Sequence, residues 1–258
     1  MDLETIKQLG IKAAYHAGRI LNSHFGKITQ VTKKGVIDLV TTADIESEQT
    51  ILNTIRDAFP DHTILAEESG QIAGAAANRW IVDPLDGTTN FSHNLGIYSV
   101  SIAYAYNDQV VVGIVLNPHN GELFTAVRGQ GAQLNNQPIR VSAATDLTDS
   151  LLVTGFPYNI RDGADVLMQR FTKFLMNAQG IRRLGSAALD LCYVACGRFD
   201  GFWENRLKPW DTAAGALIAE EAGGRVTDYL DGPFQMDRGE ILASNSRIHQ
   251  KMLDLLQQ

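Results

Sequence analysis

The chain has 258 residues, of which 45% are hydrophobic and 20% are charged, a composition typical of a soluble globular protein. Its formal net charge is −7 and no long run of Lys or Arg offsets it, which argues against nucleic-acid binding driven mainly by phosphate neutralisation. The chain opens with acids rather than with a basic signal-peptide start, and it lacks the run of about 18 apolar residues that a membrane span needs, so we expect a cytoplasmic protein.

Helical periodicity predicts two helices near the start of the chain. Apolar residues recur close to the helical period from residue 3 to residue 25, and Gly26 follows as a stop signal. A second apolar stripe covers residues 44–59, and Pro60 ends it because proline cannot continue a helix. We therefore expect the chain to begin with a pair of amphipathic helices.

Two short strands are predicted next, at residues 63–66 and 80–82. The first runs into Glu67 and the second runs into Asp83, so each of these acids lies where a strand ends. Catalytic groups favour such positions, because a rigid strand aims the residues that leave it. These acids are the first candidates for a functional site.

The pattern of the chain changes near residue 145. Alternating hydrophobicity over residues 98–128 predicts a β-meander, whereas strands and helices alternate in the second half, as in α/β proteins. We therefore divide the chain into an α+β half, residues 1–145, and an α/β half, residues 146–258. In the second half we predict strands at 151–154, 181–184, 199–204 and near 226, and helices at 163–178, from 185, at 211–222 and from Ser244-Asn245 to about Leu256.

The segment Asp83-Pro84-Leu85-Asp86 has the chemistry of a metal site. Hydrolysis of a phosphate ester is very slow without a catalyst, and paired divalent metal ions can neutralise the ester, supply hydroxide and stabilise the leaving alkoxide. Mg²⁺ prefers oxygen ligands, and Pro84 favours a turn that directs both carboxylates and the Leu85 carbonyl toward one point. Taken alone, the segment is as typical of an ordinary turn as of a metal site.

The residues that follow, Gly87-Thr88-Thr89, are small and polar. Such residues can open a short helix whose free N–H groups receive a phosphate beside the metals. The hydroxyl of Thr88 can also orient an attacking water, with a carboxylate as its partner in taking the proton.

Five motifs, in order and spread over nearly the whole chain, resemble the inositol monophosphatase family within the lithium-sensitive, Mg²⁺-dependent phosphatase superfamily. The motifs are Asp38-Leu-Val-Thr-Thr-Ala-Asp44, Ala66-Glu67-Glu68-Ser69, Trp80-Ile-Val-Asp-Pro-Leu-Asp-Gly-Thr-Thr-Asn-Phe91, Gly185-Ser-Ala-Ala188 and Trp210-Asp211-Thr-Ala-Ala-Gly215. The resemblance implies a five-layer αβαβα sugar-phosphatase fold, with two intimately packed halves and the site in the cleft between them. It also suggests a homodimer.

The resemblance further implies a site that binds two or three Mg²⁺ ions. Glu67, Asp83 and the Leu85 carbonyl would hold the first ion, and Asp83, Asp86 and Asp211 would hold the second. Glu67 would also serve a third ion and so take part in catalysis. Every one of these ligands is present in the chain.

Catalysis and substrate binding are likewise assigned by the resemblance. Asp44 and Thr88 look like the pair that activates the nucleophilic water, which would attack phosphorus in line without a phosphoenzyme. The residues implied as substrate contacts are Glu67, Leu85, Asp86, Gly87, Thr88, Thr89, Gly185, Ser186, Ala187, Glu204 and Asp211.

Glu204 points to a substrate rich in hydroxyl groups. A carboxylate accepts hydrogen bonds from vicinal hydroxyls, and it would repel a second phosphate nearby. The alternative is a surface acid paired with Arg206 or Lys208. Residues 185–188 have an alternative too, because small residues at the start of a helix are also explained by helix packing.

Two pairs of basic residues, Lys33-Lys34 and Arg182-Arg183, each have two interpretations. The family has a lysine in a mobile metal-site loop, and either Lys33 or Lys34 can correspond to it, because Gly35 and the residues after it depart from the animal form. Arg182-Arg183 is interpreted as a surface pair rather than an anion contact.

The function that the sequence favours is Mg²⁺-dependent hydrolysis of a phosphate monoester. Inositol 1-phosphate is the favoured substrate, with a possible broader range of small polyol and sugar phosphates. One alternative is a fructose-1,6-bisphosphatase on the same scaffold. The other is a regulatory binding protein in which phosphatase activity is incidental.

Overall fold

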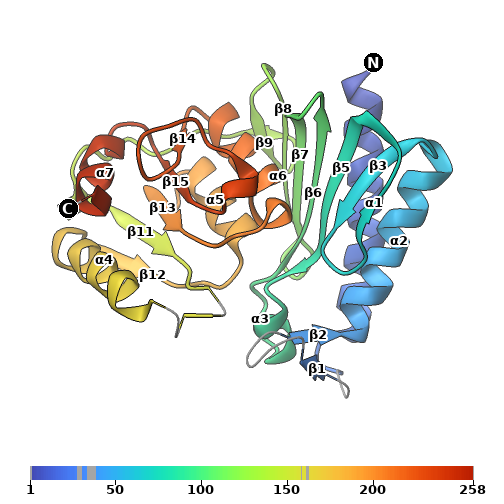
Figure 1. The fold of residues 1–258 in the computed structure, drawn as a ribbon, viewed down its shortest axis with the longest axis horizontal. Coiled ribbons are helices and arrows are strands. Elements are labelled where there is room, and N and C mark those ends of the chain that lie inside the picture. Colours follow the sequence, from blue (N-terminus) through green and yellow to red (C-terminus); the bar gives the residue numbers. More distant parts are fainter. Residues whose placement is uncertain (1, 28–30, 34–38, 158, 161–162, 258) are drawn as a thin grey trace.

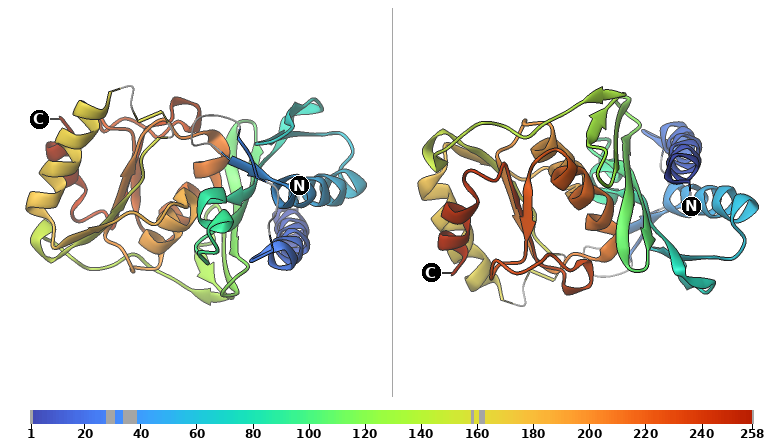
Figure 2. Two further views of the ribbon diagram at one scale, coloured as in Figure 1. Left: turned by 90° about the horizontal axis from the view of Figure 1, so that it is seen from below. Right: turned by 90° about the horizontal axis from the view of Figure 1, so that it is seen from above.

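A computed structural model describes residues 2–27, 31–33, 39–157, 159–160 and 163–257. Helices and sheets alternate in five layers across the molecule (Figures 1 and 2). Three hydrophobic clusters fill the spaces between the layers. The predicted αβαβα arrangement is confirmed.

The outer layer beside the N-terminus consists of α1 (Leu3–His24) and α2 (Thr42–Ala58), as the periodicity predicts. α1 begins at Asp2, whose side chain accepts the N–H of Glu4, and α2 begins with a capping box between Thr41 and Asp44. The two helices pack side by side on one face of the large sheet (Figure 1).

The large sheet has eight strands in the order β10-β9-β8-β7-β6-β5-β3-β4. Its strands are β3 (His62–Ala66), β4 (Gly70–Ile72), β5 (Ala75–Asp86), β6 (Ser99–Tyr106), β7 (Gln109–Asn117), β8 (Glu122–Val127), β9 (Ala132–Leu134) and β10 (Gln137–Pro138). The meander predicted over residues 98–128 is confirmed as β6, β7 and β8. A separate pair, β1 (Val31–Lys33) and β2 (Leu39–Thr41), has no counterpart among the predicted strands.

β5 is longer than the sequence predicts at both ends, because it begins at Ala75 instead of residue 80 and continues through Asp86 instead of ending at residue 82. Its pairing with β6 shifts register between Asp83, opposite Ser101, and Asp86, opposite Ser99. Pro84 lies within the shift and has no N–H to donate to the ladder, so the strand bulges at the acidic segment.

The central layer consists of α5 (Ala187–Ala195) and α6 (Pro209–Glu221), which lie between the two sheets (Figure 1). Eight consecutive residues of α6, from Thr212 to Ala219, are buried. A helix covered by a sheet on both sides must be apolar all round, which explains the run of Ala, Gly, Leu and Ile that follows Thr212.

The remaining two layers belong to the second half of the chain. The five-stranded sheet has the order β12-β11-β13-β15-β14, with bounds Gly180–Arg182, Leu151–Thr154, Gly201–Glu204, Ile241–Ser244 and Arg225–Thr227. α4 (Ala164–Asn177) and α7 (His249–Gln257) cover its outer face. Three short elements complete the described chain: α3 (Thr88–Ser92) and the 3₁₀ turns Leu147–Asp149 and Met236–Arg238.

The prediction that the last helix begins at Ser244-Asn245 is wrong. Ser244 ends β15, where it pairs with Gly201 of β13, and α7 begins at His249. Asn245 is nevertheless a cap, because its Oδ1 accepts the N–H groups of Arg247 and Ile248. The capping signal is real, but it marks a turn that precedes the helix.

The proposed boundary at residue 145 falls between β10 and the first 3₁₀ turn. The central cluster joins residues of both halves, such as Ile81 and Phe124 with Val153 and Phe202. The division into 1–145 and 146–258 therefore stays a prediction. None of the helices in the described part of the chain is long and apolar enough to cross a membrane.

Candidate active site

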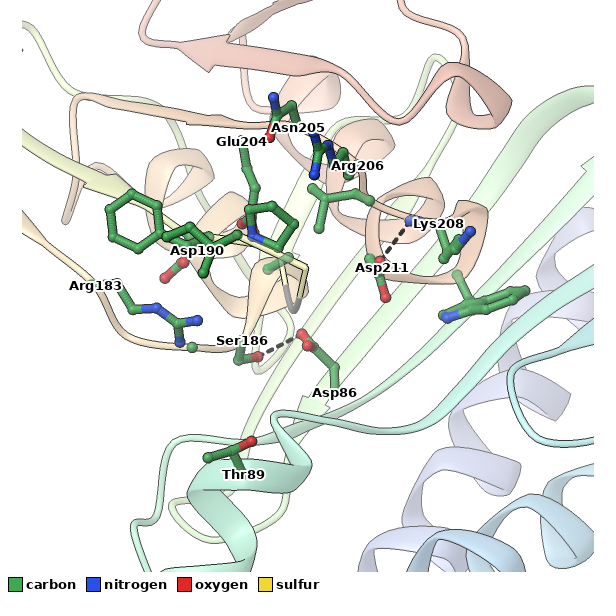
Figure 3. A pocket seen from close by; sticks show the side chains of 18 of the residues that line it. Asp86, Thr89, Arg183, Ser186, Asp190, Glu204, Asn205, Arg206, Lys208 and Asp211 are labelled. Carbon is green, nitrogen blue, oxygen red and sulfur yellow. Dashed lines mark hydrogen bonds between the residues drawn. The ribbon is translucent and has the colours of Figure 1, made fainter. Parts of the chain in front are cut away.

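A cavity of about 580 Å³ lies between the two halves of the chain (Figure 3). Of the predicted site residues, its lining includes Glu67, Asp86, Thr89, Gly185, Ser186, Ala187, Glu204 and Asp211. The other predicted residues are buried beside this lining and are Asp44, Asp83, Leu85, Gly87 and Thr88. The fold thus gathers residues that are far apart in the sequence around one space.

Glu67 and Asp83 are brought together by two adjacent strands. β3 and β5 run parallel with Ala66 opposite Val82, and the N–H of Glu67 donates to the Val82 carbonyl at 3.2 Å. The N–H of Leu85 donates to Asp83 Oδ1 at 2.9 Å and closes the turn around proline 84. The acids therefore leave the same edge of the sheet.

Asp86 connects the first half of the chain to the second. Its Oδ2 accepts a hydrogen bond from the Ser186 hydroxyl at 2.6 Å and another from the Ala188 N–H at 2.8 Å. Figure 3 shows the first of these bonds as a dashed line between Ser186 and Asp86. Gly87 has φ 98° and packs so closely that an added Cβ would lie 3.2 Å from the Gly185 carbonyl oxygen. The two halves meet directly at this point.

Asp44 and Thr88, for which the family resemblance implies activation of the water, are hydrogen-bonded to each other. The Thr88 hydroxyl lies 3.0 Å from Asp44 Oδ1 and 3.1 Å from the Leu85 carbonyl oxygen, so its single proton serves one acceptor at a time. The other carboxylate oxygen of Asp44 accepts the Thr41 N–H at 2.8 Å. Burial raises the pKa of Asp44, and the hydrogen bonds from Thr41 and Thr88 oppose that effect.

Three further acids of the site have raised pKa values, chiefly because the protein removes them from water. Burial raises the pKa of Asp83, and the neighbouring negative charges of the site raise it further. Burial raises the pKa of Asp86 to about 6, although the hydrogen bonds from Ser186 and Ala188 lower it. Burial and the charge of Asp86 raise the pKa of Asp211, whose Oδ2 accepts the Lys208 N–H at 2.7 Å. A bound cation would relieve this concentration of negative charge.

The chemistry of the donor set fits Mg²⁺. The candidate ligands are carboxylates and one backbone carbonyl, which are the hard oxygen donors that this ion prefers. Among the residues that the structure describes, however, no three His, Cys, Asp or Glu side chains converge closely enough to hold an ion as they stand. The assignment of Glu67, Asp83, Leu85, Asp86 and Asp211 as metal ligands therefore stays a prediction.

Glu204 lies at the end of β13 with its carboxylate at the cavity wall (Figure 3). Its side chain is 8% exposed, so the alternative of a surface acid is wrong. Burial raises its pKa to about 8. Gly155 packs against this carboxylate, because an added Cβ there would collide with both of its oxygens.

Several residues of the cavity wall were not predicted from the sequence. Asp190 of α5 is buried, and its Oδ1 has no hydrogen-bond partner in the described part of the chain. An acid inside the otherwise apolar run 187–195 is a signal that could have found it. Arg183 is exposed, as expected of a surface residue, but it also lines the cavity. No sequence signal distinguishes it from Arg182.

The candidates for the metal-site lysine are Lys33 and Lys34. Lys34 and Asp38 lie outside the described residues, and of Lys33 only the backbone in β1 is described.

Comparison with known proteins decides the family. The family model of inositol monophosphatases matches residues 2–258. The chain belongs to the inositol monophosphatase family. An inositol-1-monophosphatase of Synechocystis sp. is 46% identical over 258 residues, which cover 99% of this chain and 90% of that protein. The Nus factor SuhB of Escherichia coli is 44% identical over 248 residues, which cover 95% of this chain and 93% of that protein.

A solved structure agrees with the fold of this family member. The extragenic suppressor protein suhB of Bartonella henselae superimposes with a TM-score of 0.95 at 42% identity, covering 98% of this chain and 99% of that one. Membership of the inositol monophosphatase family supports a phosphatase, and the family is generally Mg²⁺-dependent. The roles of the individual site residues stay predictions.

Proposed function

We propose that the protein is a Mg²⁺-dependent phosphate monoester hydrolase that acts on inositol 1-phosphate and, more broadly, on small polyol and sugar phosphates. The observation that carries the proposal is the set of acids that line one cavity from both halves of the chain, Glu67, Asp86 and Asp211, with the buried Asp83 near all three. The relative of Synechocystis sp. supports it by name.

Glu67, Asp83, the Leu85 carbonyl, Asp86 and Asp211 would hold the metal ions. Bound Mg²⁺ supplies positive charge for the phosphate and lowers the pKa of a coordinated water.

The remaining residues bind and orient the reactants. Thr88 holds the attacking water, and Asp44 takes its proton through the Thr88 hydroxyl, which lies 3.0 Å from Asp44 Oδ1. Thr89 and the backbone of residues 86–89 receive the phosphate. Glu204 accepts hydrogen bonds from the substrate hydroxyls, with residues 185–187 beside it.

Substrate choice is tested by comparing two esters. We expect a higher kcat/KM for myo-inositol 1-phosphate than for fructose 1,6-bisphosphate at matched Mg²⁺ and at about pH 9, where the Glu204 carboxylate is ionised and repels a second phosphate. The fructose-1,6-bisphosphatase alternative is favoured by one observation, which is that the cations Arg183, Arg206 and Lys208 line the same cavity. A preference for the bisphosphate would establish that alternative.

A regulatory binding role is the second alternative, and the name of the Escherichia coli relative, Nus factor SuhB, is what favours it. A cellular role that survives loss of catalysis in Asp83→Asn would support binding over hydrolysis.

We further propose a cytoplasmic location, and the family resemblance supports two more parts of the proposal: a homodimer and inhibition by Li⁺. Light scattering of the purified protein tests the homodimer, and titration of the Mg²⁺-supported activity with millimolar Li⁺ tests the inhibition. A monomeric mass contradicts the first, and an activity indifferent to Li⁺ contradicts the second.

A further inference from the structure

One face of α2 presents three buried polar side chains in succession. Asp44, Ser47 and Glu48 are spaced i, i+3 and i+4, which places them on the same side of the helix, and they are 0%, 0% and 4% exposed. Buried polar groups are costly unless hydrogen bonds satisfy them. The partners of these three side chains therefore show what the face is for.

Glu48 holds the turn that follows Glu67. Its Oε2 accepts the N–H of Glu68 at 2.8 Å, and its Oε1 accepts the N–H of Ser69 at 2.9 Å. Both bonds are charge-assisted, and together they fix two successive peptide groups immediately after Glu67. The direction in which the chain leaves β3, and with it the position of Glu67, depends on this carboxylate.

Ser47 holds the other acidic segment. Its hydroxyl donates to the Pro84 carbonyl oxygen at 2.9 Å. That carbonyl belongs to the peptide group between Pro84 and Leu85, within the bulge that separates Asp83 from Asp86. The hydrogen bond therefore sets the orientation of the backbone from which the Leu85 carbonyl is presented.

We propose that Ser47 and Glu48 are positioning residues for the metal site. Through them, α2 holds the Glu67 turn and the bulge of β5 in a fixed position relative to Asp44, which lies on the same helix face and accepts the Thr88 hydroxyl. The inference rests on the proposed function, in which Glu67 and the bulge supply metal ligands. Supporting groups of this kind matter because metal ligands must be held to within about 0.5 Å of their working geometry.

The test is the affinity of the metal-free protein for Mg²⁺, measured by calorimetric titration with MgCl₂ and no substrate. Glu48→Gln keeps the shape of the side chain but replaces one acceptor oxygen with an NH₂ group that faces a backbone N–H. We expect the dissociation constant to rise about 10-fold or more. The matched control is Glu46→Gln, the same change at an exposed position of α2 that pairs with His24, and its affinity should equal that of the wild type.

Ser47→Ala provides a second variant that removes only one neutral hydrogen bond. We expect it to fold and to bind Mg²⁺ about 3- to 10-fold more weakly. Thermal unfolding without metal separates positioning from general stability. If both variants lower Tm and yet bind Mg²⁺ as tightly as the wild type, their role is structural and the inference is refuted. A wild-type protein that binds no Mg²⁺ refutes the proposed function and the inference with it.

Discussion

The contact between Gly155 and Glu204 offers a way to move a substrate-binding group without changing it. Gly155 has no positive φ, so Ala is tolerated by the backbone, but its Cβ would collide with the Glu204 carboxylate. Glu204 is buried at the end of β13 and must turn away from its present position. The predicted effect of Gly155→Ala is therefore steric and local.

The magnitude follows from the hydrogen bond that would be lost. At about pH 9, where a carboxyl group with a pKa of about 8 is ionised, a hydrogen bond to the charged Glu204 contributes about 1.5–3 kcal/mol, which corresponds to a loss of about 10- to 150-fold in kcat/KM for myo-inositol 1-phosphate. An ester without hydroxyl groups, p-nitrophenyl phosphate, should lose less than about 2-fold, because it makes no bond to Glu204.

The assay compares both esters at saturating Mg²⁺. Gly180→Ala in β12 is the matched control, since the nearest atom to its added Cβ lies at 3.4 Å, in a side chain, and it should behave as the wild type. An equal loss for both esters would show that the change disturbs the whole site. No loss for either ester would show that Glu204 does not bind substrate.

Two further substitutions test other parts of the structure. Ser186→Ala removes the hydrogen bond to Asp86 and the N-cap of α5. The free energy of unfolding should fall by about 1–2 kcal/mol, and Mg²⁺ should bind about 10-fold more weakly. Denaturant titration with and without Mg²⁺ measures both effects, and an unchanged Mg²⁺ affinity would contradict a role of this hydrogen bond in metal binding. The buried ring of His249 is hydrogen-bonded through Nε2 to the Thr227 hydroxyl and through Nδ1 to the Ser244 hydroxyl. Burial lowers the pKa of His249 to about 4. Below pH 6.5 the unfolded chain takes up a proton that the folded ring does not, so this residue costs up to about 3 kcal/mol of stability as the pH falls toward 4. His249→Gln should flatten that part of the pH dependence, and an unchanged slope in urea unfolding between pH 4 and 6.5 would contradict the assignment.

The helices and the meander could be predicted because their signals are local. α1 and α2 carry apolar stripes at the helical period, and each is followed by a residue that stops a helix, Gly26 or Pro60. β15 could not be predicted in the same way. Its four residues are all buried between neighbouring strands and show no alternation, and Ser244-Asn245 gives a capping signal at its end.

The residues of the site could likewise be predicted only where the sequence carries a local signal. The acids near Pro84 could be selected from the sequence because they are clustered and belong to an ordered set of motifs. Glu48 could not, because a glutamate on an amphipathic helix is ordinarily exposed. Only the packing of α2 against the turn after β3 gives its two oxygens their partners. Residues that support the site, such as Glu48, can therefore be identified from the structure but not from the sequence motifs.

The central claim, an Mg²⁺-dependent phosphatase centred on the acids of β5, is tested most directly with Asp83→Asn. The amide oxygen can still accept the Leu85 N–H, and the change removes a charge whose burial is unfavourable, so the fold and the metal-free Tm should be preserved. Phosphate release from myo-inositol 1-phosphate is the measurement. We predict release by the wild type only with Mg²⁺ and none by Asp83→Asn, whereas release without the metal, or by the folded variant at the wild-type rate, would contradict the account.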